Sequence, residues 1–209
     1  MPLGALYQDA IALLDAAHVD VAPLRSGGRK LVFTADDGTV FITTRPSDVP
    51  TYVEAGAADL GIVGRDVINE RRPDVYELLD LKFGGCRMVY ATAAGDDPTP
   101  EIIARLGVLR VATKYPQVAE AHFLATGRQV ELVKVNGSVE LGPLVGLADG
   151  IVDLVATGRT LRENGLVERE QIFDSSARLI ANRVSHKLRA EDIDALTARL
   201  AEAVAAESA

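Results

Sequence analysis

The sequence predicts an α/β fold made of two small lobes. Its 209 residues suit one domain or two lobes of roughly 100 residues each. Beyond residue 108, strand-like and helix-like stretches alternate, which is typical of a parallel sheet covered by helices. The stretch 95–100 is rich in turn-forming residues without an apolar period, and it predicts a lobe boundary.

The chain begins with an amphipathic helix and a hairpin. Apolar residues recur at helical spacing over 6–17, which predicts a helix. The strand-like runs 30–33 and 40–43 flank the turn Asp36-Asp37-Gly38 and predict a β-hairpin.

A further helix and several strands precede the lobe boundary. Ser47 can serve as the N-cap of a helix that runs to Glu54 and stops at Gly56. Apolar runs then predict strands and a short helix, namely strands 58–63, 75–81 and 87–93 and helix 66–70.

The alternating region, which ends with a short helix from Thr160, contains apolar and β-branched runs that predict strands at 108–113, 130–135 and 151–156. After it, similar runs predict strands at 167–173 and 178–182. Helical spacing predicts helices at 117–125, 139–148, from Thr160, and at 190–206, the last of which is rich in alanine.

Composition excludes several classes of protein. A hydrophobic share of 48% with 25% charged residues allows a real core. The balance of 22 basic against 30 acidic residues, net charge -8, disfavours nucleic acid as a partner, although the doublets 29–30 and 71–72 suffice for one small anion. One cysteine, no leader-like start and no apolar run of membrane-spanning length lead us to expect a cytoplasmic protein without a membrane partner.

The strongest chemical signal is the segment 153–161, an apolar strand that runs into a hydroxyl-bearing turn before a helix. Gly158 permits close approach of the backbone, N–H groups at the helix start point outward, and the hydroxyls of Thr157 and Thr160 add donors. This arrangement binds phosphate, but an ordinary helix N-cap with a solvent-exposed Arg159 explains the same pattern. Asp153, a carboxylate in an apolar strand, must be paired, capped or used.

An internal similarity connects the two halves. Residues 56–65 align without gaps on residues 150–159, sharing glycines, an Asp-Leu pair and a final arginine. Both duplication and chance explain the match. Two similar lobes would turn the carboxyl ends of their strands toward a shared ligand cleft.

Several segments, in order, resemble the ATP phosphoribosyltransferase family, the first enzyme of histidine biosynthesis, in its short form. The resemblance runs from about Gly4 to Lys187 and is carried by Arg45–Glu54, Gly56–Gly64, Tyr76–Asp80, Ala112–Pro116, Asn136–Leu141 and Asp153–Leu161. It implies a fold like that of type II periplasmic binding proteins, with mixed sheets and a cleft. Residues 1–93 with about 167–209 would form the first lobe, and about 94–166 the second.

The resemblance also implies a reaction and its residues. N1 of ATP would attack C1 of phosphoribosyl pyrophosphate with inversion, giving phosphoribosyl-ATP and pyrophosphate, with Mg²⁺ as cofactor. The residues Thr157, Gly158, Arg159, Thr160 and Leu161 would hold the 5-phosphate, with Asp153 and Glu140 at the ribose hydroxyls. Arg29 would be catalytic, because a fixed guanidinium together with Mg²⁺ stabilises a departing pyrophosphate. No side chain is expected as a dedicated metal ligand.

Expected partners follow from the same resemblance. They are ATP, phosphoribosyl pyrophosphate and a regulatory subunit similar to histidyl-tRNA synthetase, assembled with catalytic homodimers into a hetero-octamer. Relatives begin with an apolar strand and a lysine where this sequence has Leu3, and short-form relatives often have arginine where it has Ala5. We therefore expect either a late start or a compensating feature. The alternative function is a noncatalytic two-lobed binder of a small phosphorylated or amino-acid ligand.

Overall fold

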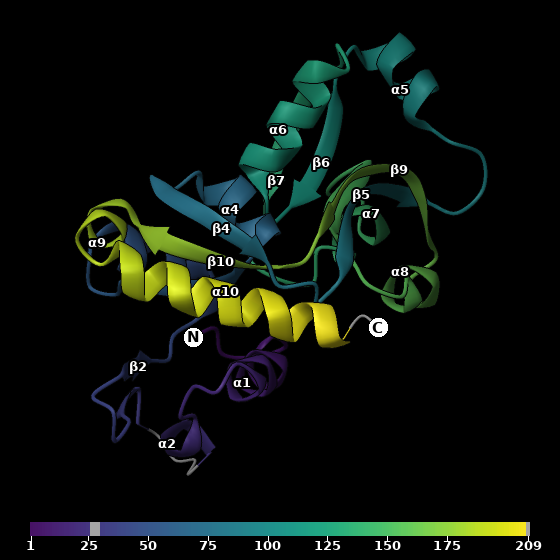
Figure 1. Ribbon diagram of the computed structural model, residues 1–209. Coiled ribbons are helices and arrows are strands. Elements are labelled where there is room, and N and C mark those ends of the chain that lie inside the picture. The colour runs from purple at the N-terminus through teal and green to yellow at the C-terminus, as the bar shows by residue number, and fades with distance from the viewer. Residues whose placement is uncertain (26–29, 208–209) are drawn as a thin grey trace. The chain divides into compact units, whose positions relative to one another are not determined.

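The computed structural model describes residues 1–25 and 30–207, which form two compact units (Figure 1). The first unit consists of Met1–Gly84 and Ser176–Ala209, and the second of Gly85–Ser175. The first unit is therefore discontinuous in sequence, and the second is one continuous segment.

The second unit is built on a mixed five-stranded sheet in the order β7-β6-β8-β5-β9. Its strands are β5 (Cys86–Ala93), β6 (Leu109–Thr113), β7 (Val130–Lys134), β8 (Gly150–Val155) and β9 (Leu166–Ser175). The three strands from the alternating region, β6, β7 and β8, are parallel as expected. β5 lies antiparallel to both β8 and β9.

Helices cover both faces of this sheet. They are α5 (Thr99–Leu106), α6 (Pro116–Ala125), α7 (Leu141–Leu144) and α8 (Arg159–Glu163). Tyr90 and Val152 belong to the apolar cluster that contains Phe123 of α6, and α6 lies along β6 and β7 in Figure 1. Val89 and Ile151 belong to a second cluster, which contains Leu161 of α8. Alternate residues of each strand thus serve opposite faces.

The boundaries between the two units lie after Gly84 and after Ser175, whereas the sequence predicts them near residues 93 and 167. Residues 93 and 167 fall inside β5 and β9, which pair with each other from Cys86↔Ser175 to Ala93↔Leu166. This ladder joins both strands along their length to the sheet of the second unit, so a boundary between the units cannot lie inside either strand.

The first unit contains a three-stranded antiparallel sheet in the order β3-β10-β4, namely β3 (Leu60–Gly64), β4 (Val75–Asp80) and β10 (Ala177–Asn182). The predicted hairpin is confirmed as β1 (Val32–Thr34) and β2 (Val40–Ile42). The helices are α1 (Tyr7–Ala16), α2 (Ala22–Arg25), η1 (Pro46–Asp48), α3 (Val49–Glu54), α4 (Arg65–Arg71), α9 (Arg183–Leu188) and α10 (Ala190–Glu207).

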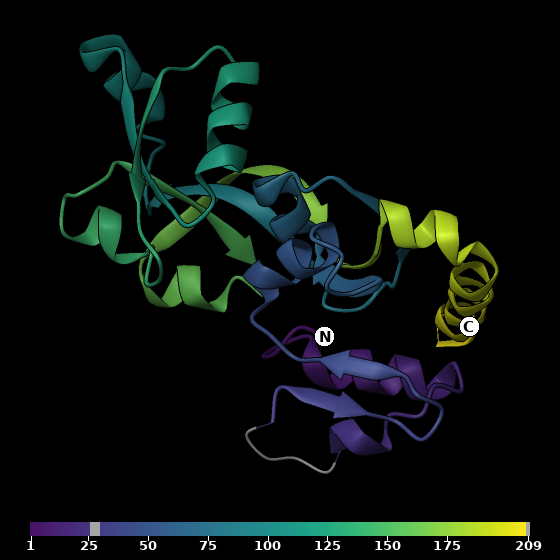
Figure 2. The ribbon, with the colours of Figure 1, turned by 90° about the vertical axis from the view of Figure 1, so that its left-hand side faces the viewer.

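One core joins these elements of the first unit. Leu13 of α1, Phe41 of the hairpin and Leu200 of α10 belong to the same buried cluster, and Figure 2 shows the hairpin beside α1. Leu13 and Leu200 are at most 1% exposed. Segments from both ends of the sequence are therefore needed to complete this core.

The first residues of the chain run alongside the end of β2. Leu3 N donates to Thr44 O at 2.8 Å, and Thr44 N donates to Met1 O at 3.1 Å. These bonds form a parallel bridge between Pro2 and Thr44. Met1–Leu3 thus begins a strand-like pairing with the segment that follows β2.

Two predicted details were wrong. The side chain of Ser47 donates to Asp48 Oδ1 at 3.0 Å and caps no helix, because Pro46 starts a 3-10 turn before α3. The helix expected over 139–148 is only Leu141–Leu144, since Pro143 lies within it and Gly146 adopts a left-handed φ of +71°.

Candidate functional site

The predicted phosphate segment forms an exposed loop between β8 and α8. Gly158 is the N-cap residue of α8 and has a left-handed φ of +72°, a conformation that glycine adopts without steric cost. Thr157 and Thr160 are both exposed, so their hydroxyls can meet a ligand. Since the N-cap is a glycine with no side-chain cap, an ordinary threonine cap does not account for the pattern.

The backbone of this loop offers hydrogen-bond donors. The Arg159 N–H donates weakly to Thr157 Oγ1 at 3.4 Å, and Arg162 N donates to Gly158 O at 3.2 Å as an early bond of α8. The first N–H groups of any helix lack an intrahelical acceptor. Because α8 has only five residues, these local amides matter here more than a helix dipole.

Leu161 is a buried core residue and not a side-chain ligand. It is 6% exposed and belongs to the cluster of Val155 and Leu166. Its side chain fixes α8 against the sheet, and only its backbone N–H remains as a donor for a ligand. Arg159 has the opposite character, because its exposed side chain pairs with Glu163, with Nε 2.7 Å from Oε1.

Asp153 and Glu140 belong to segments that pack on the same side of the sheet as Leu161 of the loop. Asp153 is half-buried in the middle of β8, and alternation places it on the face of Ile151 and Val155. Glu140 is the half-buried N-cap residue of α7, and the preceding Val139 shares an apolar cluster with Ile151 and Val155. Both residues therefore belong to segments whose apolar side chains share one cluster with Leu161 of the loop.

Two arginines that sequence reasoning did not select hold the loop. Arg87 of β5 donates from Nη1 to Ala156 O at 3.4 Å, and Arg162 of α8 donates from Nη1 to Thr157 O at 3.1 Å. Arg87 also binds Glu168 through Nε at 3.0 Å and Nη2 at 2.7 Å. The hydrogen bond with Glu168 raises the pKa of the Arg87 guanidinium. No local sequence pattern indicates Arg87, because it lies 69 positions before Ala156 in the sequence.

Arg29, the expected catalytic residue, lies outside the described residues. Within the described ranges, no group of three or more His, Cys, Asp or Glu side chains could hold a metal ion. The carboxylates grouped at the loop can supply single oxygen ligands, which suits Mg²⁺ bound mainly by substrate phosphates.

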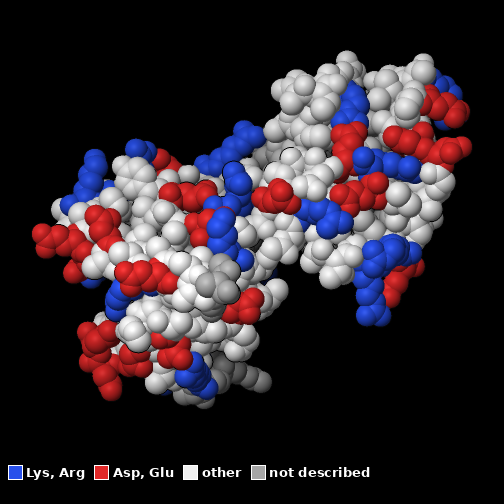
Figure 3. All heavy atoms as spheres, turned by 45° about the vertical axis from the view of Figure 1, so that its right-hand side comes forward, with Lys and Arg blue, Asp and Glu red and all other residues white. Residues whose placement is uncertain are grey.

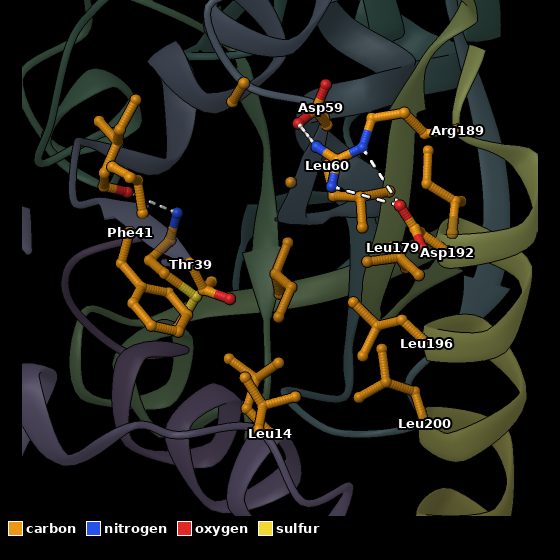
Figure 4. A pocket seen from close by; sticks show the side chains of 18 of the residues that line it. Leu14, Thr39, Phe41, Asp59, Leu60, Leu179, Arg189, Asp192, Leu196 and Leu200 are labelled. Atoms are coloured by element: carbon orange, nitrogen blue, oxygen red, sulfur yellow. Dashed lines mark hydrogen bonds and ion pairs between the residues drawn. The ribbon is translucent and has the colours of Figure 1, made fainter. Parts of the chain in front are cut away.

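A cavity of about 480 Å³ lies elsewhere, in the first unit (Figure 4). Leu14, Leu196 and Leu200 line its apolar part, while Arg189 pairs with Asp59 at 2.8 Å at the polar end. None of the described residues expected to bind substrate lines it.

The same cavity is bordered by β2 and β3. β3 is the edge of its sheet, and β2 pairs within its own sheet only with β1. The cavity is therefore a slot between two strand edges.

The charged surface is mixed in sign. On the face shown in Figure 3, Lys and Arg side chains are interspersed with Asp and Glu side chains and form no continuous basic track. No helix in the described part of the chain is long and apolar enough to cross a membrane.

Comparison with known proteins gives consistent results. The HisG family model, described as ATP phosphoribosyltransferase, matches residues 45–202. A curated ATP phosphoribosyltransferase of Rubrobacter xylanophilus is 51% identical over 199 residues, which cover 95% of this chain and 92% of that protein.

Two solved structures extend the comparison to the fold. An ATP phosphoribosyl transferase (HisG:HisZ) complex from Thermotoga maritima contains a chain that is 32% identical, with a TM-score of 0.81 and coverage of 97% of this chain and 96% of that one. The substrate binding protein of an amino acid ABC transporter is 15% identical, with a TM-score of 0.56 and coverage of 92% and 80%, respectively, a likeness of fold alone. These likenesses confirm the predicted α/β fold class, which resembles that of periplasmic binding proteins.

Proposed function

The chain belongs to the ATP phosphoribosyltransferase family, which carries out the first step of histidine biosynthesis, and on that premise we propose that the 5-phosphate of its phosphoribosyl donor binds at Thr157–Leu161. The observation that carries this proposal is the exposed, glycine-capped loop with two exposed threonine hydroxyl groups beside backbone donors. Phosphate oxygens accept hydrogen bonds from such an arrangement.

The ribose of the donor would lie beside the two carboxylates. Asp153 of β8 and Glu140 at the start of α7 belong to segments that share an apolar cluster with Leu161, and both carboxylates can accept hydrogen bonds from ribose hydroxyls. Holding both ends of the sugar fixes its C1 relative to the attacking nitrogen. Such alignment can supply several kcal/mol of the barrier reduction, about 7–11 kcal/mol in the best intramolecular cases.

The reaction requires no nucleophilic side chain. The electron pair on N1 of ATP forms the bond to C1, the bond from C1 to the pyrophosphate oxygen breaks, and pyrophosphate leaves with that electron pair. Positive charge develops on the ribose and negative charge accumulates on the leaving group. We assign Arg29 to that negative charge, because a guanidinium forms two-point hydrogen bonds with phosphate oxygens.

A metal ion belongs to this chemistry. Enzymes of the family need a metal, and we infer that it is Mg²⁺, which would reach the site with the diphosphate of the donor. Asp153 and Glu140 are the carboxylates best placed to complete its coordination. When bound, the ion would neutralise charge on the pyrophosphate.

We further propose a partner for the chain. The Thermotoga structure is a HisG:HisZ complex whose transferase chain this chain covers to 96%. This coverage supports a short-form catalytic subunit that assembles with a regulatory subunit. We infer that the regulatory subunit is similar to histidyl-tRNA synthetase and that catalytic homodimers assemble with it into a hetero-octamer. Its site of action would be the cytoplasm, where its two phosphorylated substrates occur.

The decisive experiment mixes the chain with ATP, phosphoribosyl pyrophosphate and Mg²⁺, with and without the partner subunit, and measures phosphoribosyl-ATP. Arg29→Ala should lower turnover much more than it weakens ATP binding, while Lys30→Ala, next to it in sequence, serves as the control. Equal turnover in Arg29→Ala and the unsubstituted chain would remove Arg29 from the mechanism. Donor binding without any product in either mixture would favour the noncatalytic binder instead.

A further inference from the structure

Two guanidinium groups bind consecutive carbonyls of the phosphate loop. Ala156 O accepts from Arg87 Nη1 at 3.4 Å, and Thr157 O accepts from Arg162 Nη1 at 3.1 Å. A Cβ built on Gly158 would lie 3.0 Å from Arg162 Nη1 and 4.0 Å from Arg87 Nη2. Both arginines therefore reach the same turn of backbone from different elements.

These two bonds set the direction of the loop amides. In a planar trans peptide the C=O and N–H groups point in opposite directions. Because the carbonyls of Ala156 and Thr157 face the guanidiniums, the N–H groups of Thr157 and Gly158 point away from them. The two N–H groups thus point to the side of the loop backbone opposite to the guanidinium groups.

Arg87 is itself fixed from behind. Its Nε and Nη2 both bond to the carboxylate of Glu168 on β9, and the two side chains are only 32% and 28% exposed. A two-point bond of this kind holds the guanidinium plane, and the remaining Nη1 is then directed at Ala156 O. A lysine has no such fork and cannot bind Glu168 and the carbonyl in the same way.

We propose that Arg87 is a positioning residue for the 5-phosphate of the donor. It acts by holding Ala156 O, and so orienting the loop amides, rather than by touching the substrate. This role rests on the proposed phosphate site at Thr157–Leu161. Arg162, which belongs to α8 itself, completes the same arrangement from the other side.

The chain contains a matched control for this arrangement. Arg110 of β6 bonds to Asp149 through Nη2 at 3.0 Å and donates from Nη1 to Gly146 O at 3.4 Å. Arg87 lies opposite Val155 at the carboxyl end of β8, whereas Asp149 directly precedes β8. Arg110 therefore makes the same kinds of bond near the amino end of β8, at the end of the strand opposite to the loop.

The test compares Arg87→Met with Arg110→Met in the full chain with its partner subunit, ATP and Mg²⁺. Loss of one hydrogen bond from a charged donor should raise the KM for phosphoribosyl pyrophosphate by about tenfold in Arg87→Met. In that variant, kcat and the KM for ATP should stay within about threefold. Arg110→Met should leave all three constants near those of the unsubstituted chain, although both variants lose thermal stability.

Arg87→Lys provides a second measurement, since it keeps the charge and a single bond to Glu168. It should also raise the donor KM, and calorimetry with ribose 5-phosphate alone should show weaker binding than in the unsubstituted chain. Equal donor KM values in Arg87→Met and Arg110→Met would overturn the proposal. If Arg87→Met fails to fold, an unsubstituted-like KM in Arg87→Lys would overturn it equally. Absence of product and of ribose 5-phosphate binding in the unsubstituted chain would instead refute the proposed site itself.

Discussion

Replacing Gly158 with alanine tests the loop by adding a single methyl group. The backbone there has a φ of +72°, where an L-residue costs about 1–2 kcal/mol. The new Cβ would also lie 3.0 Å from Arg162 Nη1 and 3.8 Å from Val155 Cγ1. Arg162 must therefore shift, and its bond to Thr157 O at 3.1 Å is loosened.

Both effects have an expected size. Backbone strain of about 1 kcal/mol lowers the melting temperature of a chain of this length by roughly 2–4 °C. The displaced loop amides should weaken the binding free energy of the donor by about another 1–2 kcal/mol. This loss should raise the KM for phosphoribosyl pyrophosphate by roughly 5- to 30-fold. The KM for ATP should change much less, because we propose that the loop binds the phosphoribosyl donor and not ATP.

The assay is steady-state kinetics with each substrate varied, together with thermal unfolding. Gly165→Ala is the matched control, since Gly165 also has a left-handed φ of +64° but nothing within 4 Å of its added Cβ. Both variants should lose similar stability, whereas only Gly158→Ala should lose affinity for the donor. A donor KM raised equally in both variants, or in neither, would refute the reasoning.

Three further predictions concern the rest of the molecule. Leu161→Ala should cost about 2–5 kcal/mol of unfolding free energy in urea titrations, and a loss of donor affinity at unchanged stability would contradict its core role. Burial alone would raise the pKa of Asp80, but hydrogen bonds from Lys82 and Ser176 outweigh it and lower that pKa to about 2. Asp80 should therefore stabilise the fold by about 2 kcal/mol above pH ~4, an effect lost as the pH falls toward 2. The free energy of unfolding, measured as a function of pH, should fall less steeply at acid pH in Asp80→Asn than in the unsubstituted chain, and an unchanged acid dependence would disprove this. A short stretch of alternating apolar residues placed ahead of Met1 should pair with the edges of β2 and β3 and raise the melting temperature, and an unchanged value would show that the slot takes no strand.

Elements with clear periodicity were predictable, whereas two short helices, Thr99–Leu106 and Arg183–Leu188, were missed. The helix Thr99–Leu106 contains Pro100 in its first turn, a position that suits proline in a helix as well as in a turn. The helix Arg183–Leu188 begins at Asn182, whose side chain accepts from Val184 N and Ser185 N at 2.9 Å each. That capping signal was present in the sequence and could have been used.

Strand pairing between distant segments could not be predicted from local pattern. The apolar runs of β5 and β9 suit either direction, and their antiparallel ladder joins residues about 80 positions apart. The same limit applies to the site. The loop was visible because its residues are contiguous, whereas the bond from Arg87 to Ala156 O spans 69 positions.

The roles of individual site residues also depended on their surroundings. Leu161 lies in the predicted phosphate segment, yet it belongs to the short helix α8, which directs its side chain into the core. Asp153 was identified because a carboxylate in an apolar strand is costly to bury unless it is paired or used. Arg29 stays a prediction, since it lies outside the described residues.

The discontinuity of the first unit affects the order in which the two units can fold during translation. Leu179 and Leu200 share a buried cluster with Leu13 and Phe41, and β3 pairs with β10. A ribosome delivers the chain from its amino end, so the segment Gly85–Ser175 can close its own sheet while the earlier residues still wait for their last strand and helix. The second unit should thus mature first on the nascent chain, and the first unit can finish only when translation is nearly over.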